Sequence, residues 1–171
     1  FYLMTTFVLS WGTSALGYSR STFLPIQMLG VVFFGLAIPV SAIMADRMGS
    51  RPTLLLATLG IGLFGFLFHP LFGAGTVGSV IAFQIIGFSL MGLTYGPLGT
   101  ALSDLFPTAV RYTGASLTFN FGGIVGASLA PYLATRLATD HGLAAVGYYM
   151  SAAALITAVA LFATPRKSEF N

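Results

Sequence analysis

The chain has 171 residues, of which 56% are hydrophobic and only 6% are charged, and its formal net charge is +3. Soluble domains carry about 25% charged residues, so this composition excludes an ordinary water-soluble fold. The absence of cysteine excludes a disulfide framework and a thiolate metal site. The mean hydropathy of +0.91 and the 21 glycines instead indicate closely packed membrane helices.

Long apolar runs divide the chain into predicted membrane spans. A spanning helix needs about 20 apolar residues. The runs predict an all-α bundle with one partial span at 1–16 and five full spans at 21–45, 52–71, 77–103, 112–137 and 143–163. The chain opens at Phe1 inside an apolar run, so we expect a fragment of a longer protein, with all of 1–171 in one transmembrane bundle.

Short polar turns separate the spans and set their orientation, because basic residues collect on the cytoplasmic side. One set of turns, with the C-terminus, holds Arg47, Arg51, Arg111, Arg166 and Lys167. The opposite set holds Arg20 and Arg136, the second in a predicted turn over 136–142. We therefore expect the turns at 46–51 and 104–111, and the C-terminus, to face the cytoplasm.

Small residues recur at a spacing of four in the predicted span 112–137, which places them along one ridge of a helix. The row consists of Gly114, Thr118, Gly122, Gly126 and Ala130. Gly92 and Gly96 repeat the pattern in the span 77–103. Small residues at this spacing let helix backbones approach each other, so both rows predict close helix packing.

Two of the predicted cytoplasmic turns carry recognisable motifs. The first, Asp46-Arg47-Met48-Gly49-Ser50-Arg51, resembles the loop signature of the major facilitator superfamily. The second runs Asp104-Leu105-Phe106-Pro107-Thr108-Ala109-Val110-Arg111 and continues Tyr112-Thr113-Gly114-Ala115-Ser116. It is most similar to the metabolite:proton symporter family of that superfamily. Four positions depart from these patterns: Ala42 replaces Gly, Ser50 a basic residue, Asp104 the commoner Glu, and Asn120 the commoner Gln.

The resemblance covers essentially the whole chain and implies the C-terminal six-helix half of a twelve-helix transporter, with its first helix truncated. It implies secondary transport of a small metabolite, an organic acid or a zwitterion, across the inner membrane by alternating access and with proton symport. The implied partners are the small-molecule substrate, protons, membrane lipid and the missing N-terminal half.

The charged residues of the two motifs form one predicted cytoplasmic group: Asp46, Arg47, Arg51, Asp104 and Arg111. By resemblance, this group ties helix ends together in the outward-open state and loosens when the transporter opens inward. The alternative is a set of solvated loop charges, each pair contributing about 1 kcal/mol or less.

Candidate substrate-contacting residues follow from depth in the membrane. Tyr95 lies nine residues before Asp104 and Asn120 nine after Arg111, so each is ~13 Å from the cytoplasmic turn and near the midplane. Transporters of this kind bind substrate there, between their two halves. Tyr2 and Thr6 on the first segment are plausible companions. For Asn120, an interhelical hydrogen bond is the alternative role.

Gln27 and Gln84 lie ~28–30 Å from the cytoplasmic turns by the same rise per residue, so we expect them in an outer vestibule. The predicted span interiors hold no Asp, Glu, Lys or Arg, and such groups normally mark proton relays. We therefore expect the proton-coupling groups in the missing half.

Other classes of function remain open at this stage. Gly12-Thr13-Ser14-Ala15 half-resembles the Gly-x-Ser-Gly of intramembrane serine proteases, but Ala15 replaces the final Gly. His69 and His141 fall at predicted helix ends and form no ligand cluster. We predict no enzyme activity, no cofactor or metal and no nucleic-acid partner. A sugar-porter-like facilitator, a helical scaffold and a channel subunit are the alternatives to a symporter.

Overall fold

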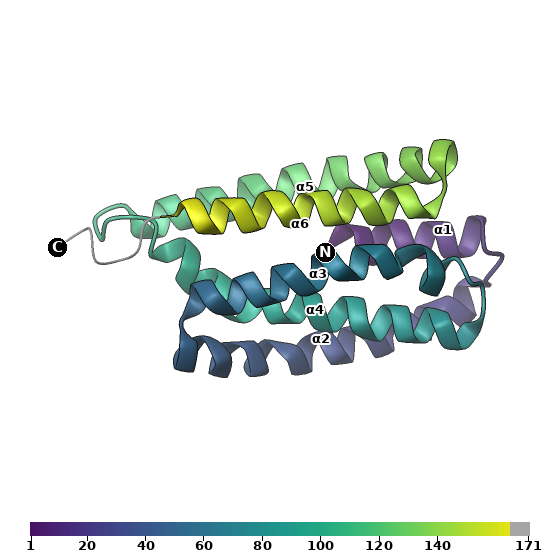
Figure 1. Ribbon diagram of the computed structural model, residues 1–171, viewed down its shortest axis with the longest axis horizontal. Helices are drawn as coiled ribbons and strands as arrows, with labels where there is room; N and C mark the ends of the chain where they lie inside the picture. The colour runs from purple at the N-terminus through teal and green to yellow at the C-terminus, as the bar shows by residue number, and fades with distance from the viewer. Residues whose placement is uncertain (165–171) are drawn as a thin grey trace.

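The computed structural model describes residues 1–164 and consists of helices joined by short turns (Figure 1). The elements are η1 (Leu3–Phe7), a π-helix, followed by α1 (Val8–Ser14), α2 (Arg20–Met48), α3 (Ser50–Phe72), α4 (Val77–Ser103), α5 (Arg111–His141) and α6 (Leu143–Ala163). This confirms the predicted all-α fold. Arg166 and Lys167, which the orientation argument used, lie outside the described residues.

Five helices, α2 to α6, are long and apolar enough to cross a membrane. They lie roughly side by side along the long axis of the bundle (Figure 1). The α2–α3 and α4–α5 turns lie at one end of the bundle, and the α5–α6 turn lies at the other. The first segment differs from the single helix that the sequence predicts, because it starts as a π-helix and ends at Ser14.

Single glycines make the two sharpest turns. Gly49 has φ 95° and Gly142 has φ 80°, a backbone region that favours glycine. The helices therefore extend further than predicted: Asp46 lies in the last turn of α2. The predicted turn over 136–142 is likewise wrong, since α5 continues to His141 and only Gly142 reverses the chain.

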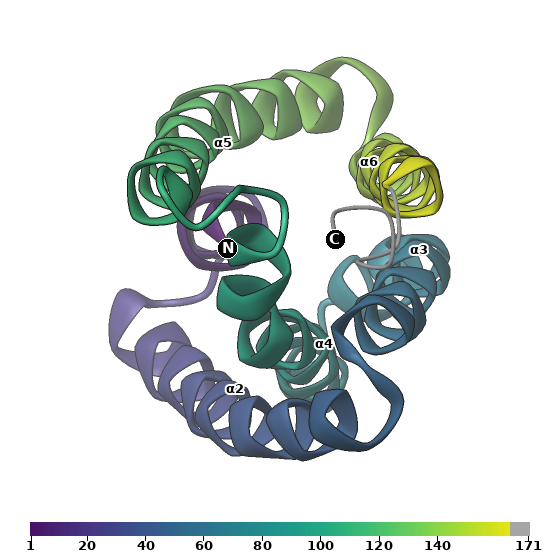
Figure 2. The same ribbon diagram turned by 90° about the vertical axis from the view of Figure 1, so that its left-hand side faces the viewer.

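In the end-on view, the helices follow one another around the bundle in the order α2, α4, α3, α6, α5, with the N-terminal segment between α5 and α2 (Figure 2). The closest pairs meet through small residues. A Cβ on Gly92 would meet the carbonyl oxygen of Phe34 on α2, and one on Gly147 of α6 would meet the carbonyl oxygen of Gly65 on α3. Gly92 and Gly96 therefore pack as the sequence predicts.

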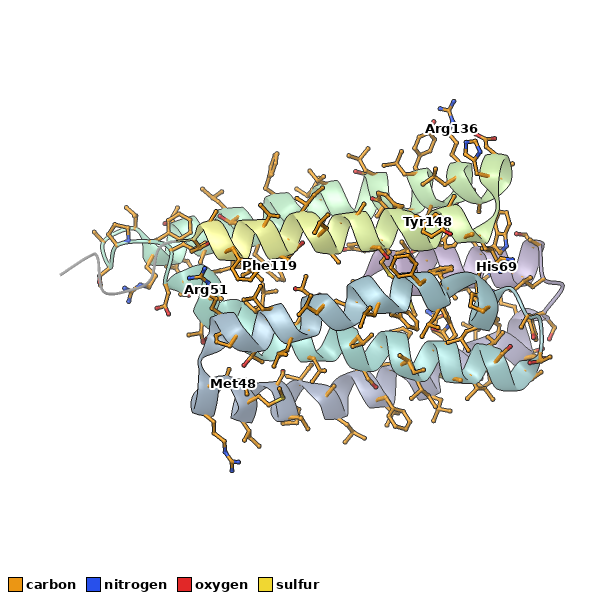
Figure 3. All side chains as sticks on the ribbon, in the orientation of Figure 1. Met48, Arg51, His69, Phe119, Arg136 and Tyr148 are labelled. Carbon is orange, nitrogen blue, oxygen red and sulfur yellow. The ribbon has the colours of Figure 1, made fainter. Side chains whose placement is uncertain are left out.

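An aromatic core fills the end of the bundle near His69 (Figure 3). Phe68, Phe72 and Phe83 are fully buried, and their ring centres lie 4.8 to 5.8 Å apart. Phe7 and Phe23 join them from η1 and α2. This core anchors η1 and α1 against α2, α3 and α4, at the end of the bundle opposite the two charged motifs.

Helix α5 packs much less closely than its neighbours. Its buried residues are Ala134 and Ala138, both in its second half. A Cβ on Gly122 or Gly126 would meet no atom within 4 Å. The prediction of close packing is therefore wrong at Gly122 and Gly126 within the described chain, because α5 buries its residues near its His141 end, whereas a Cβ on Gly114 would meet the Phe106 ring.

Candidate functional site

The four candidate substrate-contacting residues lie on elements that touch one another. Tyr2 immediately precedes η1 and Thr6 lies within it, while Tyr95 is on α4 and Asn120 on α5. The π-helix contacts both α4 and α5, and α4 also contacts α5. All four side chains are exposed, Tyr2 at 36% and Tyr95 at 37%. The chain thus presents polar groups from three neighbouring elements on an open surface.

A row of four aromatic rings connects two of these residues, Tyr2 and Tyr95. Tyr2 packs edge-on against Phe1, with ring centres 5.4 Å apart. Phe1 meets Phe34 of α2 at 6.5 Å, and Phe34 meets Tyr95 at 5.1 Å, both edge-on. Edge-to-face pairs fix ring orientation. The two tyrosines are therefore held at opposite ends of one aromatic row that spans η1, α2 and α4.

Asn120 hydrogen bonds within its own helix. Its Nδ2 donates to the carbonyl oxygen of Ser116 at 2.8 Å and to the Ser116 hydroxyl at 3.4 Å. The proposed alternative, an interhelical hydrogen bond, does not form among the described residues. Asn120 is exposed on α5, as is the preceding residue Phe119, which Figure 3 labels.

A hollow of about 440 Å³ lies between the ends of α2, α3 and α4 on the predicted cytoplasmic side. Asp46 and Asp104 both line it, together with Ser50 and Thr100. The α2 and α4 backbones approach closely beside the hollow, since a Cβ on Gly96 would lie only 2.8 Å from the backbone nitrogen of Ala42. The two motifs therefore meet at one site, although their first residues, Asp46 and Asp104, are 58 positions apart in the sequence.

Two of the three arginines of the predicted charged group donate hydrogen bonds to backbone carbonyls. Arg51 donates from its guanidinium to the carbonyl oxygen of Phe162, at 2.7 Å. Arg111 donates from Nε to the carbonyl oxygen of Phe106, at 3.3 Å. Arg47 is exposed on the last turn of α2. Asp46 and Asp104 are the acidic side chains that line the hollow.

Two features of the site have no signal in the sequence. The π-helix at Leu3–Phe7 looks like any other apolar helical stretch. The partner of Arg51 is a backbone carbonyl, which every residue carries, so no side-chain pattern could identify Phe162. The sequence also mispredicts the surroundings of Gln84. Its depth along α4 predicts an outer vestibule, yet its side chain is fully buried.

Comparison with known proteins identifies the group to which the chain is related. The inner membrane metabolite transport protein YhjE of Escherichia coli (strain K12) is 46% identical over 169 residues, which cover 96% of this chain and 38% of that protein. The Escherichia coli (strain K12) shikimate transporter is 29% identical, over 92% of this chain and 37% of that protein. The proline/betaine transporter of the same organism is 27% identical, over 91% of this chain and 31% of that protein.

The chain belongs to the major facilitator superfamily. It spans less than two fifths of the length of these three relatives, which is consistent with one half of a major facilitator fold. Its five apolar helices and its inner-membrane relative make it a multi-pass protein of the inner membrane. No protein-family model matches the chain, and no solved structure matches it.

Proposed function

We propose that this major facilitator chain is the C-terminal half of a secondary transporter that carries a small metabolite across the inner membrane by alternating access, coupled to proton symport. The observation that carries the proposal is the similarity to three transport proteins over 91% to 96% of the chain. The relatives are transporters, which also fits the expectation that the chain is not an enzyme.

The proposed substrate is a small organic acid or zwitterion. The names of two relatives specify shikimate, a carboxylate, and proline and betaine, which are zwitterions. In this proposal Tyr2, Thr6, Tyr95 and Asn120 supply hydroxyl and amide groups to such a solute. These neutral groups can orient a carboxylate by hydrogen bonds, while the charged partners of the solute and the proton-coupling groups come from the other half of the transporter.

The charged residues near the α2–α3 and α4–α5 turns form the proposed gate. Asp46 and Asp104 line one hollow where α2, α3 and α4 end, and Arg51 and Arg111 hold the adjacent helix ends. A rearrangement of α2 relative to α4 would change the separation of the two carboxylates. The helix ends are therefore where a change between outward-open and inward-open states would act on this chain.

Uptake by the intact transporter in proteoliposomes tests the proposal. Shikimate, proline and betaine serve as radiolabelled probes, with and without an imposed pH gradient that is acidic outside. We expect uptake of at least one probe, accelerated by the gradient and abolished by a protonophore. Uptake that ignores the gradient would support a facilitator instead. The described chain alone is the matched control, and proton-driven uptake by it would contradict the assignment of the coupling groups to the other half.

A further inference from the structure

Gln84 on α4 is the most unusual polar side chain of the structure. It is 0% exposed, and neither its Nε2 nor its Oε1 has a hydrogen-bond partner within residues 1–164. Its neighbours along the helix, Phe83 and Phe88, are also fully buried. An amide loses its water hydrogen bonds on burial, and that loss is costly unless new partners replace them. The arrangement therefore indicates that a hydrogen-bonding ligand belongs beside Gln84.

Gln27, on the neighbouring helix α2, also has one buried amide atom that lacks a described hydrogen-bond partner. Gln27 on α2 donates from Nε2 to the carbonyl oxygen of Thr5, at 3.2 Å. Its Oε1 is buried and has no hydrogen-bond partner in the described part of the chain. Thr5 belongs to the π-helix η1, so Gln27 points toward the start of the chain. π-helical turns are frequent at functional sites.

The register of α2 and α4 places the two glutamines at the same level. A Cβ on Gly30 would lie 2.6 Å from the Phe88 ring, and one on Gly92, four residues further along α4, would meet the carbonyl of Phe34, four residues further along α2. The two helices therefore run in the same direction. Gln27 precedes Gly30 by three residues and Gln84 precedes Phe88 by four, which is about one turn in each case.

The π-helix η1 lies beside the same parts of α2 and α4. A Cβ on Gly87, one turn from Gln84, would lie 3.1 Å from the sulfur of Met4. Met4 is adjacent to Thr5, the acceptor of the Gln27 hydrogen bond. Gln27 and Gln84 thus both face the junction of η1, α2 and α4. The two side chains carry three buried amide atoms without a hydrogen-bond partner among the described residues: Gln27 Oε1, Gln84 Oε1 and Gln84 Nε2.

We infer that this junction is a buried hydration site, in which at least one ordered water bridges Gln27 Oε1 and the Gln84 amide. Water fits the groups present, because it can donate to both carbonyl oxygens and accept from Nε2, and buried waters characteristically satisfy such groups. A metal cation fits less well, because hard cations require more oxygen ligands and usually carboxylates. The bridge joins η1, and with it Tyr2 and Thr6, to α2 and α4 by hydrogen bonds. The inference rests on geometry and stands whether or not the proposed function is correct.

X-ray hydroxyl-radical footprinting of the intact protein tests this inference, because radicals formed from a bound water oxidise the side chains next to it. Met4 and Met91 form a matched pair, since they are 5% and 7% exposed. Met91 lies seven residues beyond Gln84, or ~10 Å along α4. We expect Met4 to be oxidised at least about fivefold faster than Met91, and Gln84→Leu to bring the two rates together while Met91 is unchanged.

Two results would overturn the inference. Equal rates for Met4 and Met91 in the parent protein would mean a dry junction, such as a direct hydrogen bond between the two glutamines. Fast oxidation of Met4 that persists in Gln84→Leu would mean that the water comes from bulk solvent. If Gln84→Leu fails to fold, Gln27→Leu replaces it, because Gln27 is only half-buried; the same loss of Met4 oxidation is expected.

Discussion

Arg51 and Phe162 are joined in two ways across 111 residues of sequence. The Arg51 guanidinium donates to the Phe162 carbonyl oxygen at 2.7 Å, and its carbon lies 6.0 Å from the centre of the Phe162 ring. Arg51 is in the first turn of α3 and Phe162 in the last turn of α6 (Figure 3 labels Arg51). A cation at the C-terminal end of a helix meets its partial negative charge. The contact therefore joins the first charged motif, at the start of α3, to the end of α6.

Removal of this contact should destabilise the protein by a small, measurable amount. Interactions of this kind contribute about 0.3–1 kcal/mol, so Arg51→Ala should lower the melting temperature of the intact protein by about 1–3 °C. Arg51→Lys should recover part of the loss, since it keeps the charge but not the planar guanidinium. Arg47→Ala, which removes an exposed arginine on the adjacent turn, is the matched control. Equal melting temperatures for the Arg51→Ala and Arg47→Ala variants would contradict the role of this contact.

Added side-chain volume between α3 and α6 should also destabilise the protein. Gly147→Ala would press a methyl group against the carbonyl oxygen of Gly65, which is backbone and cannot rotate away. Overpacking of this kind costs about 1–3 kcal/mol. We expect a lower melting temperature and a reduced yield of monodisperse protein on size-exclusion chromatography. Gly78→Ala, in open space near the start of α4, is the control. Unaltered stability of Gly147→Ala would show that the two helices are further apart than described.

The sequence predicted the helices well because apolar length and glycine turns are local properties. Gly92 and Gly96 pack as their spacing predicts, but Gly122 and Gly126 carry the same pattern and contact no other helix in the described part of the chain. Spacing describes a ridge on one helix and cannot say whether another helix covers it. The burial of Gln84 was missed for a related reason: depth along a helix follows from counting residues, whereas the direction of a side chain depends on packing between helices.

The predicted orientation can be tested by cysteine accessibility. Ser50 and Thr108 lie in or next to the turns at one end of the bundle, and Gly75 lies in the α3–α4 connection at the other end. The described chain contains no cysteine of its own to interfere. In right-side-out vesicles, we expect a membrane-impermeant maleimide to label Gly75→Cys and to spare Ser50→Cys and Thr108→Cys. In inside-out vesicles the pattern should reverse. Labelling of Ser50→Cys and Thr108→Cys from opposite sides would contradict the topology.

Asp104→Asn should shift the proposed equilibrium between outward-open and inward-open states. The substitution removes one charge of the group Asp46, Arg47, Arg51, Asp104 and Arg111, which by resemblance ties helix ends together in the outward-open state, and it keeps the size of the side chain. A surface charge interaction is worth about 1 kcal/mol or less, so the inward-open population should rise by about fivefold at most. Distances between spin labels across the cytoplasmic face would measure the populations. Asp140→Asn, which breaks the 3.7 Å ion pair with Arg136 at the opposite end, is the control. Identical populations in the parent and both variants would leave these residues as solvated charges.

The proposed substrate site is built from exposed polar groups at η1, α4 and α5. Substrate affinity of the intact transporter, measured by isothermal titration for Tyr95→Phe and Asn120→Ala, tests it most directly. Each variant loses hydrogen bonds worth about 0.5–1.5 kcal/mol, so the Kd should rise by about 2- to 13-fold. Tyr132→Phe, an exposed tyrosine nearer the outer end of α5, is the control, and folded yield is measured separately for every variant. Weaker binding by both site variants at normal yield is the predicted result, whereas affinities equal to the parent would show that Tyr95 and Asn120 do not build the site.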